Sequence, residues 1–559
     1  MTLINIYCKN LGEYLDIEGG LTLMQLAVRL GDRLPFTPVC ARVNNKTENL
    51  SFPIFAPKQV EFLDAASPSG QRVVIRTLCM MLYKAVTISA PGLSLRIEHS
   101  ISRGYLCRLF SRDGILHRPD DSLVEAIRDA MRRLADANLP LVHHEALTRD
   151  VIEIFRRQQL NSKVSLLESI HQLYTTYYDL DSTADSFYGP LAPSTGMCRL
   201  FDLIPYKDGM LLLCPDPKDP TKVSRPVPQE KMYRAFTEYL AFNQVIKVRN
   251  VGQLNEAVAA GRAADLINAA EAMHEKYIGR IAADIARRNS EGGARVVLIA
   301  GPSSSGKTTT CKRLAIHLMT NLKTPKMISL DDYFVNRDDS PLDENGEYDF
   351  ESLYALDLNR LNDDLRRLLA GEEINLPTYS FELGRRIDRP RPLRLDDDDV
   401  LLIEGIHGLN PELTRELDPD RVFKVYVSAL TSLSIDNHNW ISTTDNRLLR
   451  RIVRDHKYRN TSALDTIRRW PGVRRGEEKW IFPYQENADA TFNSSLIFEL
   501  GVMKEYAEPL LHEVPHDMPE YAEAYRLIRF LSNFRSIPSE QIPATSLLRE
   551  FLGGSSFHY

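Results

Sequence analysis

The chain has 559 residues, of which 43% are hydrophobic and 26% charged, and its formal net charge at pH 7 is −6. These values are ordinary for a globular protein of roughly two to four domains, and they exclude a chain that binds polyanions over its whole surface. No apolar run approaches the ~20 residues that cross a bilayer, the N-terminus shows no secretion signal, and the seven cysteines are dispersed, so we expect a cytoplasmic protein with reduced thiols.

Residues 1–64 carry a pattern of short strands around one helix. The segments LINIYC and EYLDI have the character of strands, and LTLMQLAVRLG is an amphipathic helix whose Thr22 and Gln25 can form a capping box. VCARVNN predicts a strand and a turn, and QVEFLD predicts a closing strand. Two strands, a helix and further strands in so short a region predict a β-grasp domain.

The rest of the chain divides into four regions. Residues 65–225 mix strands with helical stretches and contain the turn-rich segment DSFYGPLAPSTG, which predicts an α+β domain. Residues 226–292 are mostly helical and are expected to form a linker. In residues 293–505 short apolar strands alternate with helices, which is typical of an α/β domain with a parallel sheet. Residues 506–559 are expected to form a C-terminal helix and tail.

The segment VVLIAGPSSSGKTTT, residues 296–310, predicts a buried strand, a small-residue loop and the start of a helix. Its spacing is that of a phosphate loop, G-x-x-x-x-G-K-[ST]. Such a loop points backbone N–H groups at phosphate oxygens, and the following helix N-terminus adds positive potential. We expect Lys307 to reach the β- and γ-phosphates of ATP. The predicted ATP-binding residues are Gly301, Ser303, Ser304, Ser305, Gly306, Lys307, Thr308 and Thr309.

Two further apolar strands end in acidic residues. DDDVLLIEGIHGLN places Glu404 at the carboxyl end of a strand, where α/β proteins bind ligands, so Glu404 and Thr308 are the predicted Mg²⁺ ligands. KMISLDDYF places Asp331 and Asp332 at another strand end, where a carboxylate can take the proton from an attacking hydroxyl. Strand alternation predicts that these two side chains point to opposite sides. A base of this kind favours phosphate transfer to an organic alcohol over a motor or a switch.

Residues 447–479 contain eleven Lys and Arg and only four acids. In an acidic chain, a basic helix and loop of this kind is typical of a lid that closes over phosphates. A solvated charged helix and a nucleic-acid patch are the alternative interpretations of the same charges.

These motifs together resemble the uridine kinase and phosphoribulokinase family. The matching segments are ISLDDYF, YDFESLYALD, LPTYSFELGRR, IEGIHGL and RLLRRIVRD. The resemblance implies transfer of the γ-phosphoryl group, with Asp331 and Lys307 as catalytic residues. The implied acceptor-binding residues are Tyr333, Glu351, Tyr379, Phe381 and Arg386, and the implied lid residues are Arg454 and Arg459. Two positions depart from the family pattern: Gly384 stands where uridine kinases carry a base-contacting His, and Thr461 stands at a lid arginine position.

The N-terminal half resembles the front of threonyl-tRNA synthetase, with a TGS domain at 1–64 and the editing-type second domain at 65–225. DSFYGPLAPSTG is similar to that family's D-x-C-x-G-P-H-x-P-x-T-G, and VVIRTLCMML falls where the family has an H-x-x-x-H helix. The four metal-ligand positions fall on Thr77, Met81, Phe187 and Leu191, and none of these is a good zinc ligand. The resemblance therefore implies a scaffold that has lost its zinc site and its hydrolytic chemistry, and that binds, regulates or dimerises.

The sequence thus predicts an α/β P-loop kinase of a nucleoside-like alcohol, dependent on ATP and Mg²⁺, preceded by β-grasp TGS and α+β synthetase-like domains. The expected partner is a small-molecule nucleoside, with no nucleic acid and no membrane, and a homo-oligomer is left open. Two alternatives stay open as well. One is a kinase of a sugar phosphate. The other is a nucleotide-gated RNA- or ribosome-binding protein, which the TGS-like and synthetase-like regions favour.

Overall fold

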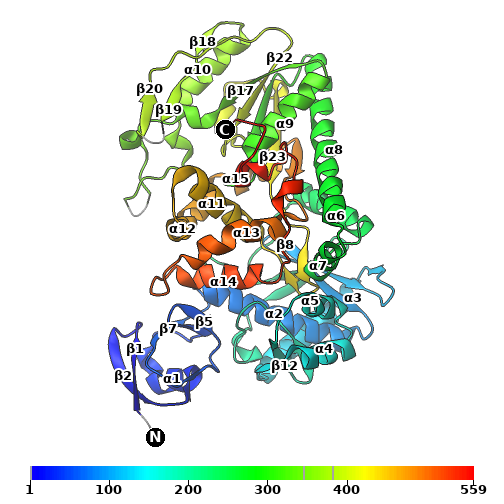
Figure 1. Ribbon diagram of the computed structural model, residues 1–559, viewed down its shortest axis with the longest axis vertical. Helices are drawn as coiled ribbons and strands as arrows, with labels where there is room; N and C mark the ends of the chain where they lie inside the picture. Colours follow the sequence, from blue (N-terminus) through cyan, green and yellow to red (C-terminus); the bar gives the residue numbers. More distant parts are fainter. Residues whose placement is uncertain (1–2, 344–345, 381–382, 559) are drawn as a thin grey trace.

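The structure is a computed structural model that describes residues 3–343, 346–380 and 383–558. Figure 1 shows the N-terminal strands at one end of the molecule and the sheet of the C-terminal domain at the other. The last helices of the chain lie between these two ends, in contact with both. The chain therefore returns to its own N-terminal half after building the C-terminal sheet.

The N-terminal unit is one sheet with a short helix. The strands have the order β2-β1-β7-β4-β5. Thr22 and Gln25 form the predicted capping box, with the Gln25 N–H 3.2 Å from the Thr22 hydroxyl and the Thr22 N–H 2.9 Å from the Gln25 side chain. The elements are β1 (Leu3–Cys8), β2 (Glu13–Glu18), β3 (Leu21–Thr22), α1 (Leu23–Leu30), β4 (Cys40–Val43), β5 (Lys46–Glu48), β6 (Pro53–Ile54) and β7 (Gln59–Leu63).

The next region packs a long helix, α2, between two antiparallel sheets and α3. One sheet has the order β10-β9-β15-β14 with β8 beside β9, and the other has the order β11-β12-β13. The elements are α2 (Pro68–Ser89), β8 (Ser94–Ile101), β9 (Gly104–Phe110), β10 (Leu116–His117), α3 (Asp121–Ala137), β11 (Val142–Leu147), α4 (Thr148–Arg157), α5 (Asn161–Ser169), β12 (Tyr174–Leu180), β13 (Thr183–Asp185), β14 (Asp202–Tyr206) and β15 (Gly209–Leu213).

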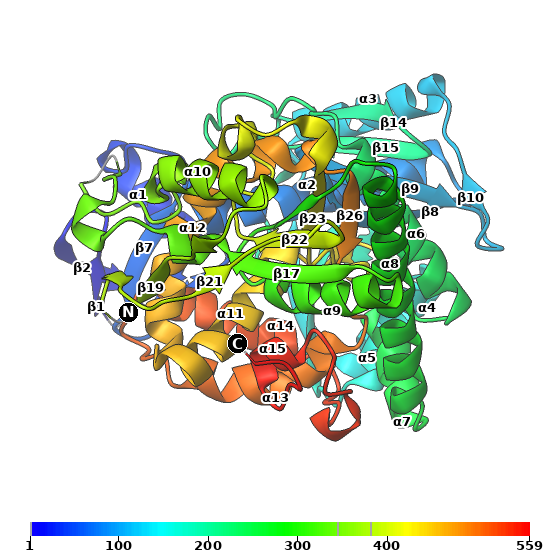
Figure 2. The ribbon, with the colours of Figure 1, turned by 90° about the horizontal axis from the view of Figure 1, so that it is seen from above.

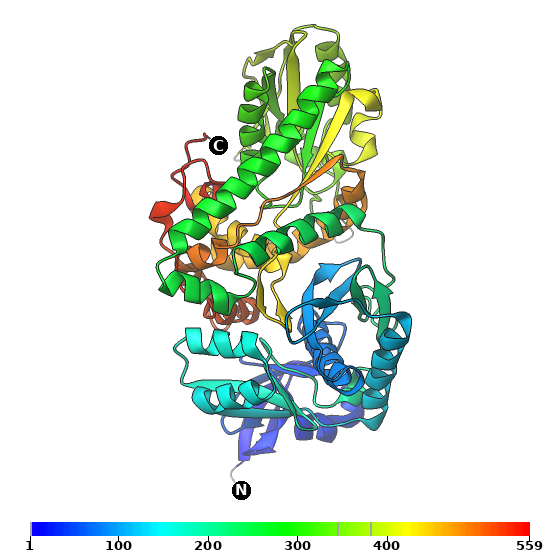
Figure 3. The same cartoon turned by 90° about the vertical axis from the view of Figure 1, so that its right-hand side faces the viewer.

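Three helices connect the two halves: α6 (Glu230–Val245), α7 (Val251–Ala259) and α8 (Ala263–Ser290). Figure 3 shows α8 running along the side of the C-terminal sheet. The buried face of α8 includes Ile278, Ala282 and Ile285, which join the core beneath that sheet. The predicted linker is thus a packed part of the C-terminal core.

The C-terminal sheet is parallel throughout, as the sequence predicts, with the order β17-β22-β16-β23-β26. Side chains alternate along each strand, so Val297 and Ile299 pack on α9 while Val296 and Leu298 pack on α10. Figure 2 shows these helices on opposite sides of the strands. The elements are β16 (Val296–Ala300), α9 (Lys307–Thr320), β17 (Thr324–Ser329), α10 (Leu358–Leu369), β22 (Asp399–Glu404), β23 (Val422–Ser428) and β26 (Ala490–Asn493).

The remaining elements surround the ends of this sheet. They are β18 (Ile374–Asn375), β19 (Thr378–Ser380), β20 (Arg385–Ile387), β21 (Pro392–Leu393), β24 (Ser434–Asp436), β25 (Asn439–Trp440), α11 (Thr443–Arg459), α12 (Ala463–Trp480), α13 (Glu499–His512), α14 (Tyr521–Leu531) and α15 (Arg549–Leu552). The predicted domain boundary at 505/506 falls inside α13, and Leu527 of α14 and Phe551 of α15 are buried in the same core as the sheet. Residues 506–559 are therefore part of the C-terminal domain, because their apolar side chains complete its core.

The hairpin of β24 and β25 joins this domain to residues 65–225. Lys163 Nζ lies 2.7 Å from Asp185 and 3.0 Å from Asp436, and His438 Nδ1 lies 2.7 Å from Asp185. All four side chains are at most 2% exposed. The buried negative charges of Asp185 and Asp436 are thus neutralised by contacts between residues 65–225 and the hairpin. These contacts fix the relative position of the two halves of the chain.

Among the residues that the structure describes, no helix combines the length and the apolar character needed to cross a membrane. All seven cysteines are buried and unpaired with one another.

The four positions predicted to correspond to the zinc ligands of threonyl-tRNA synthetase lie in a packed core. Thr77, Met81 and Leu191 are at most 1% exposed, and Phe187 is 8% exposed. The Thr77 hydroxyl donates to its own helix backbone at 2.8 Å and accepts from the Ala192 N–H at 2.9 Å. These side chains fill the space that a metal and its ligands would need.

We expect metal analysis of the purified protein to find no stoichiometric zinc. The four side chains offer no set of nitrogen, sulfur or carboxylate ligands. Within residues 3–343, 346–380 and 383–558, moreover, no group of three or more His, Cys, Asp or Glu is placed to hold a metal ion. One zinc ion per chain that survives dialysis against a chelator would contradict this prediction.

Candidate functional site

The phosphate-loop motif joins β16 to α9, and two of its glycines are required by the packing. A Cβ on Gly301 would lie 2.0 Å from the carbonyl oxygen of Val427. Gly306 has φ +86°, and a Cβ there would lie 2.6 Å from the side chain of Leu547. Lys307 begins α9, so the loop ends at a helix N-terminus, whose free N–H groups attract anions.

Two buried arginine–glutamate pairs hold the loop in place. Arg447 pairs with Glu477, with Nη2 and Oε2 2.8 Å apart, and donates to a loop carbonyl at 3.1 Å. Arg450 pairs with Glu499 and reaches the next loop carbonyl at 3.4 Å. All four side chains are at most 2% exposed. Both arginines belong to the segment predicted as a lid, but their charges are already neutralised by buried glutamates, so they support the loop instead.

The loop retains unused hydrogen-bonding groups. The hydroxyls of Ser304 and Ser305 are buried, and neither has a hydrogen-bond partner in the described part of the chain. The Ser303 N–H donates to a carboxylate oxygen of Glu477 at 3.1 Å. Buried hydroxyls without partners are available to bind a ligand. A loop N–H that donates to a carboxylate oxygen can donate to a phosphate oxygen in the same way, so both observations fit a phosphate-binding loop.

The C-terminal tail reaches the same loop. Glu550 accepts hydrogen bonds from the Thr309 N–H at 3.2 Å and from the Thr309 hydroxyl at 2.6 Å. Leu547 packs against Gly306, and Figure 1 shows the end of the chain beside α9. A carboxylate from the tail therefore caps the first turn of α9, where the helix also offers its N–H groups to phosphate.

The two acids of KMISLDDYF lie in a 3₁₀ turn, Leu330–Tyr333, that follows β17. The prediction that strand alternation separates them is therefore wrong, because the strand ends before them. Asp332 pairs with Arg391, with Nη1 and Oδ2 2.8 Å apart. The carboxylate of Asp331 has neither an ion pair nor a hydrogen bond with any described residue, and Asp331 is exposed. The region around Asp331, Lys307 and Glu404, whose charges act on the pKa values of the two acids, is here called the cleft.

The surroundings of Asp331 shift its pKa in opposite directions. Protein atoms around the cleft limit its solvation and raise its pKa, while the positive charges of Lys307, Arg459 and Arg454 lower it. These opposing effects leave a carboxylate without a partner that faces the positive charge of Lys307. Of the two acids, Asp331 is the one available as a base.

Glu404 lies at the carboxyl end of β22 and accepts a hydrogen bond from the Ser329 hydroxyl at 3.0 Å. Burial raises its pKa to about 7, the charge of Asp331 adds to this rise, and Lys307 opposes it. Negative charge at this strand end is only partly compensated, which suits a divalent cation. Glu404, with the Thr308 hydroxyl in the first turn of α9, would hold Mg²⁺ together with nucleotide phosphates.

Glu351 faces the same charges from the segment before α10. Burial raises its pKa to about 7, with Arg451 and Lys307 lowering it and Glu477 and Asp331 raising it. It packs against α12, since a Cβ on Gly476 would lie 2.4 Å from Glu351 Cβ. The structure therefore brings Glu351 to the same cleft as Asp331 and Lys307.

The other predicted acceptor residues differ in their surroundings. Tyr333 is fully buried, and its hydroxyl donates to Asp364 of α10 at 3.0 Å, so its predicted contact with the acceptor does not fit this structure. Tyr379 on β19 is half-buried, with its ring centroid 5.6 Å from that of Phe334. Phe381 lies outside the described residues.

Arg386, another predicted acceptor-binding residue, contacts the turn that carries Asp331. It pairs with Asp357 at 3.0 Å and donates to the carbonyl of Tyr333 at 3.2 Å. Its guanidinium is thus committed to backbone and carboxylate partners. This arrangement positions the turn that carries Asp331.

The two predicted lid arginines lie on the last turns of α11. Arg454 donates to Asp455 at 2.7 Å, and Arg459 lies 3.6 Å from the same carboxylate with 57% of its side chain exposed. Their charges act on the pKa of Asp331, so both surround the cleft. Their closure over a substrate stays a prediction.

Three residues that the motifs do not single out also contact the loop: Arg451, Glu477 and Glu550. Arg451 Nη1 donates to the Ser303 hydroxyl at 2.8 Å. The i, i+4 spacing of Arg447 and Arg451 was a usable signal, because it places both on one helix face. For Glu550 no local signal exists, since only tertiary packing brings the tail to the loop.

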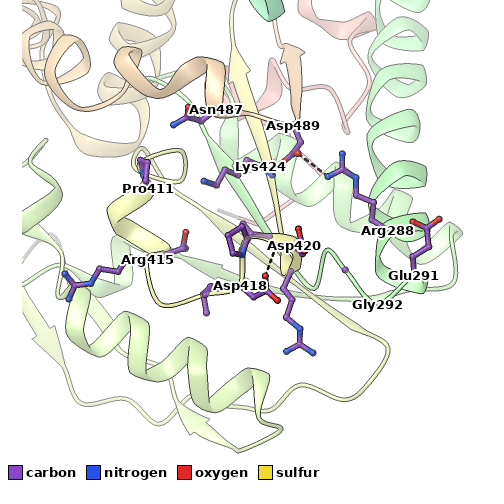
Figure 4. Close-up of a pocket in the computed structure, with 16 residues that line it drawn as sticks. Arg288, Glu291, Gly292, Pro411, Arg415, Asp418, Asp420, Lys424, Asn487 and Asp489 are labelled. Atoms are coloured by element: carbon purple, nitrogen blue, oxygen red, sulfur yellow. Dashed lines mark hydrogen bonds and ion pairs between the residues drawn. The ribbon is translucent and has the colours of Figure 1, made fainter.

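A wide cavity lies away from this site. It has a volume of about 820 Å³ and is lined by the end of α8, the start of β23 and the loops before β23 and β26. Figure 4 shows its mixed charges, including the ion pair between Arg288 and Asp489 at 3.1 Å. This cavity is at the amino ends of the strands, opposite the edge where α/β sheets bind ligands.

Part of the chain is similar to known proteins. Residues 296–496 match the family model described as Phosphoribulokinase / Uridine kinase family. A uridine kinase of Brevibacillus brevis is 29% identical over 199 residues, which are 35% of this chain and 84% of that protein. A solved structure of a possible uridine kinase from Bacillus stearothermophilus is 24% identical, covers 36% of this chain and 89% of that chain, and has a TM-score of 0.25.

A second similarity points to a different protein. A threonine–tRNA ligase of Rubrobacter xylanophilus is 27% identical over 192 residues, which are 34% of this chain and 29% of that ligase. The assignment of residues 1–64 to a TGS domain and of 65–225 to an editing-type domain stays a prediction.

Proposed function

We propose, on the premise that the C-terminal part of this chain contains a domain of the phosphoribulokinase and uridine kinase family, that the protein is an ATP-dependent kinase of a nucleoside-like alcohol. The observation that carries this proposal is the state of Asp331. It is an unpaired carboxylate beside Lys307 and the phosphate loop, whereas its neighbour Asp332 is paired with Arg391. A positioned base serves an acceptor hydroxyl.

Each residue of the cleft has a separate role in the proposed reaction. The loop N–H groups and Lys307 bind the phosphates, and Arg447 and Arg450 fix the loop from its buried side. Asp331 orients the acceptor hydroxyl and takes its proton. Glu404 and the Thr308 hydroxyl would hold Mg²⁺, which would balance the negative charge of the phosphates when ATP, the donor of the γ-phosphoryl group, is bound.

The direct test is a panel of acceptors with ATP. Nucleosides, sugar phosphates and a no-acceptor control are incubated with the full-length protein, and phosphorylated products are identified by mass. Transfer to a nucleoside supports the proposal, and transfer to a sugar phosphate alone favours the other kinase. ATP hydrolysis that is stimulated by RNA, without any phosphorylated small molecule, would favour a nucleotide-gated RNA-binding protein.

We expect no strong preference for uridine in this panel. The space beside Gly384 holds the guanidinium of Arg337, since a Cβ there would lie 2.9 Å from Arg337 Nε. No imidazole stands at this position to read a pyrimidine edge, and lost polar contacts weaken discrimination. Competing nucleosides in one reaction measure it, and a uridine preference above about a hundredfold would show that another group reads the base.

Acceptor binding should improve as pH rises through about 7. The pKa of Glu351 is raised to about 7, so its carboxylate is protonated at pH 6 and ionised at pH 8. Only the ionised form accepts hydrogen bonds with both oxygens. The KM for the acceptor should therefore fall between pH 6 and pH 8 in the wild type and stay high and flat in Glu351→Gln. A wild-type KM that is independent of pH over this range would remove Glu351 from acceptor binding.

A further inference from the structure

A small cavity, here called the junction pocket, lies where three parts of the chain meet. It is enclosed by the start of α2, the turn at residues 188–190, the strand β5 and the helix α14, and its volume is about 60 Å³. Figure 1 shows α14 lying beside α2 and β5. Four arginines and two tyrosines line it: Arg72, Arg76, Arg526, Arg529, Tyr188 and Tyr525.

The positive charge of the junction pocket exceeds the negative charge that faces it. Arg72 pairs with Glu523 at 3.2 Å, and Arg526 pairs with Glu523 and with Asp445 at 2.7 Å. Glu523 and Asp445 therefore form ion pairs with Arg72 and Arg526. Neither of these acids pairs with the other two arginines. The charge of Arg529 opposes the rise in the pKa of Glu48 on β5 that burial causes, but no ion pair joins Arg529 and Glu48 in the described part of the chain.

Arg76 and Arg529 are the arginines left over. Neither guanidinium forms an ion pair or a hydrogen bond with any residue that the structure describes. Burial, together with the positive charges of Arg72 and Arg526, lowers the pKa of Arg76 to about 9. A partly buried cation that is repelled by its neighbours is costly unless an anion compensates it.

The backbone makes room for this guanidinium. Gly189 has φ +126°, and a Cβ there would lie 2.6 Å from Arg76 Nη1. The positive φ favours glycine at this position, and its missing side chain leaves the space that the Arg76 guanidinium occupies. The planar fork of N–H groups on an arginine matches the oxygens of a phosphate group.

We propose that the junction pocket binds the phosphate group of a small molecule. A volume of about 60 Å³ is about twice the share of one water molecule in the liquid, so it admits one oxyanion group and not a whole nucleotide. Any larger part of the ligand extends outward past Arg529, which is exposed. The site is separate from the phosphate loop and is formed by other elements.

Binding here reaches the phosphate loop through α11. Arg526 holds both oxygens of Asp445, at 2.7 and 2.8 Å, and Asp445 stands in the first turn of α11. The following turns of the same helix carry Arg447, Arg450 and Arg451, which contact the loop. An anion that competes for Arg526 would loosen the start of α11. This coupling depends on the proposed kinase function, whereas the binding itself does not.

The test is the thermal stabilisation by inorganic phosphate, from which a Kd is derived. We compare the wild-type protein, Arg76→Met, Arg529→Ala, Lys307→Ala to weaken the loop site, and Arg149→Ala as a control at an arginine whose side chain is 81% exposed. Phosphate binding at the junction pocket should persist in Lys307→Ala and Arg149→Ala. It should weaken at least about tenfold in Arg76→Met and in Arg529→Ala, because each loses a charge-assisted contact.

The stability of each variant in phosphate-free buffer shows whether a loss of phosphate binding is caused by misfolding. Arg76→Met removes an uncompensated charge and orphans no carboxylate, so in phosphate-free buffer it should be at least as stable as the wild type. Unchanged phosphate binding in both Arg76→Met and Arg529→Ala would overturn the proposal. So would complete loss in Lys307→Ala alone, which would place all phosphate binding at the loop.

The source of the phosphate is identified by comparing ligands. Inorganic phosphate, a nucleoside monophosphate and a short RNA are titrated into the Lys307→Ala protein. A lower Kd for the monophosphate supports a phosphate ester, and a Kd equal to that of inorganic phosphate supports the free ion. Binding of RNA alone would overturn the assignment to a small molecule.

Discussion

Replacing Asp331 by Asn is expected to lower the rate of phosphoryl transfer by about 10²- to 10⁴-fold, the usual cost of losing a positioned base. The carboxylate of Asp331 is unpaired among the described residues, and the positive charges of Lys307, Arg459 and Arg454 act on it. Nucleotide affinity should be unchanged or slightly stronger, because a negative charge beside the phosphates is removed. Single-turnover transfer and nucleotide binding are measured separately.

Asp332→Asn is the matched control. It weakens the ion pair with Arg391 but leaves Asp331 intact, so we expect it to retain most of its transfer rate. If Asp332→Asn is inactive and Asp331→Asn is not, the base is the neighbouring residue. If both variants transfer normally, neither acid is the base, and the principal support for an alcohol acceptor is lost.

Replacing Arg450 by Met should destabilise the C-terminal domain by about 3–5 kcal/mol, the usual cost of breaking a buried ion pair. Arg450 is 0% exposed and Glu499 is 1% exposed. After the change, Glu499 keeps hydrogen bonds from Asn446 and Ser495 but loses the one cation that pairs with it among the described residues. The negative charge would then stay buried without an opposite charge.

Urea unfolding followed by tryptophan fluorescence measures this effect. The three tryptophans are Trp440, Trp470 and Trp480, so the signal reports the C-terminal domain and its hairpin. The double variant Arg450→Met with Glu499→Leu should recover most of the loss, because it replaces both charges with apolar side chains of similar size. A loss in the double variant as large as the sum of the single losses would show that the two charges do not interact.

Much of the C-terminal domain could be predicted from local patterns. A strand, a glycine-rich turn and a helix are set by neighbouring residues, so Gly301 to Thr308 was recognisable without any tertiary contact. The strands that end near Asp331 and Glu404 were visible as apolar runs, and their parallel order follows from alternating strands and helices. The Thr22 capping box is equally local, because its two residues are three positions apart.

The partners of charged residues could not be predicted in this way. Asp332 is bound by Arg391, which is 59 positions away in the chain, and this contact alone distinguishes it from Asp331. Tyr333 is the next residue in the chain, and a hydrogen bond from its hydroxyl to Asp364 holds it in the core. A residue type at a motif position therefore indicates the available chemistry, while the partner that frees or occupies the side chain comes from packing.

By itself, then, the sequence determined that this protein has a phosphate loop on a parallel sheet and that acids follow two neighbouring strands, because these features depend on backbone preferences within short segments. Only the tertiary structure decided which of the arginines at 447–459 support the loop and which face the cleft, and that the tail with Glu550 returns to α9. It also decided that Arg76 stands without a carboxylate in the junction pocket. Each of these depends on distant segments meeting in space, where burial makes the pairing of every charge matter.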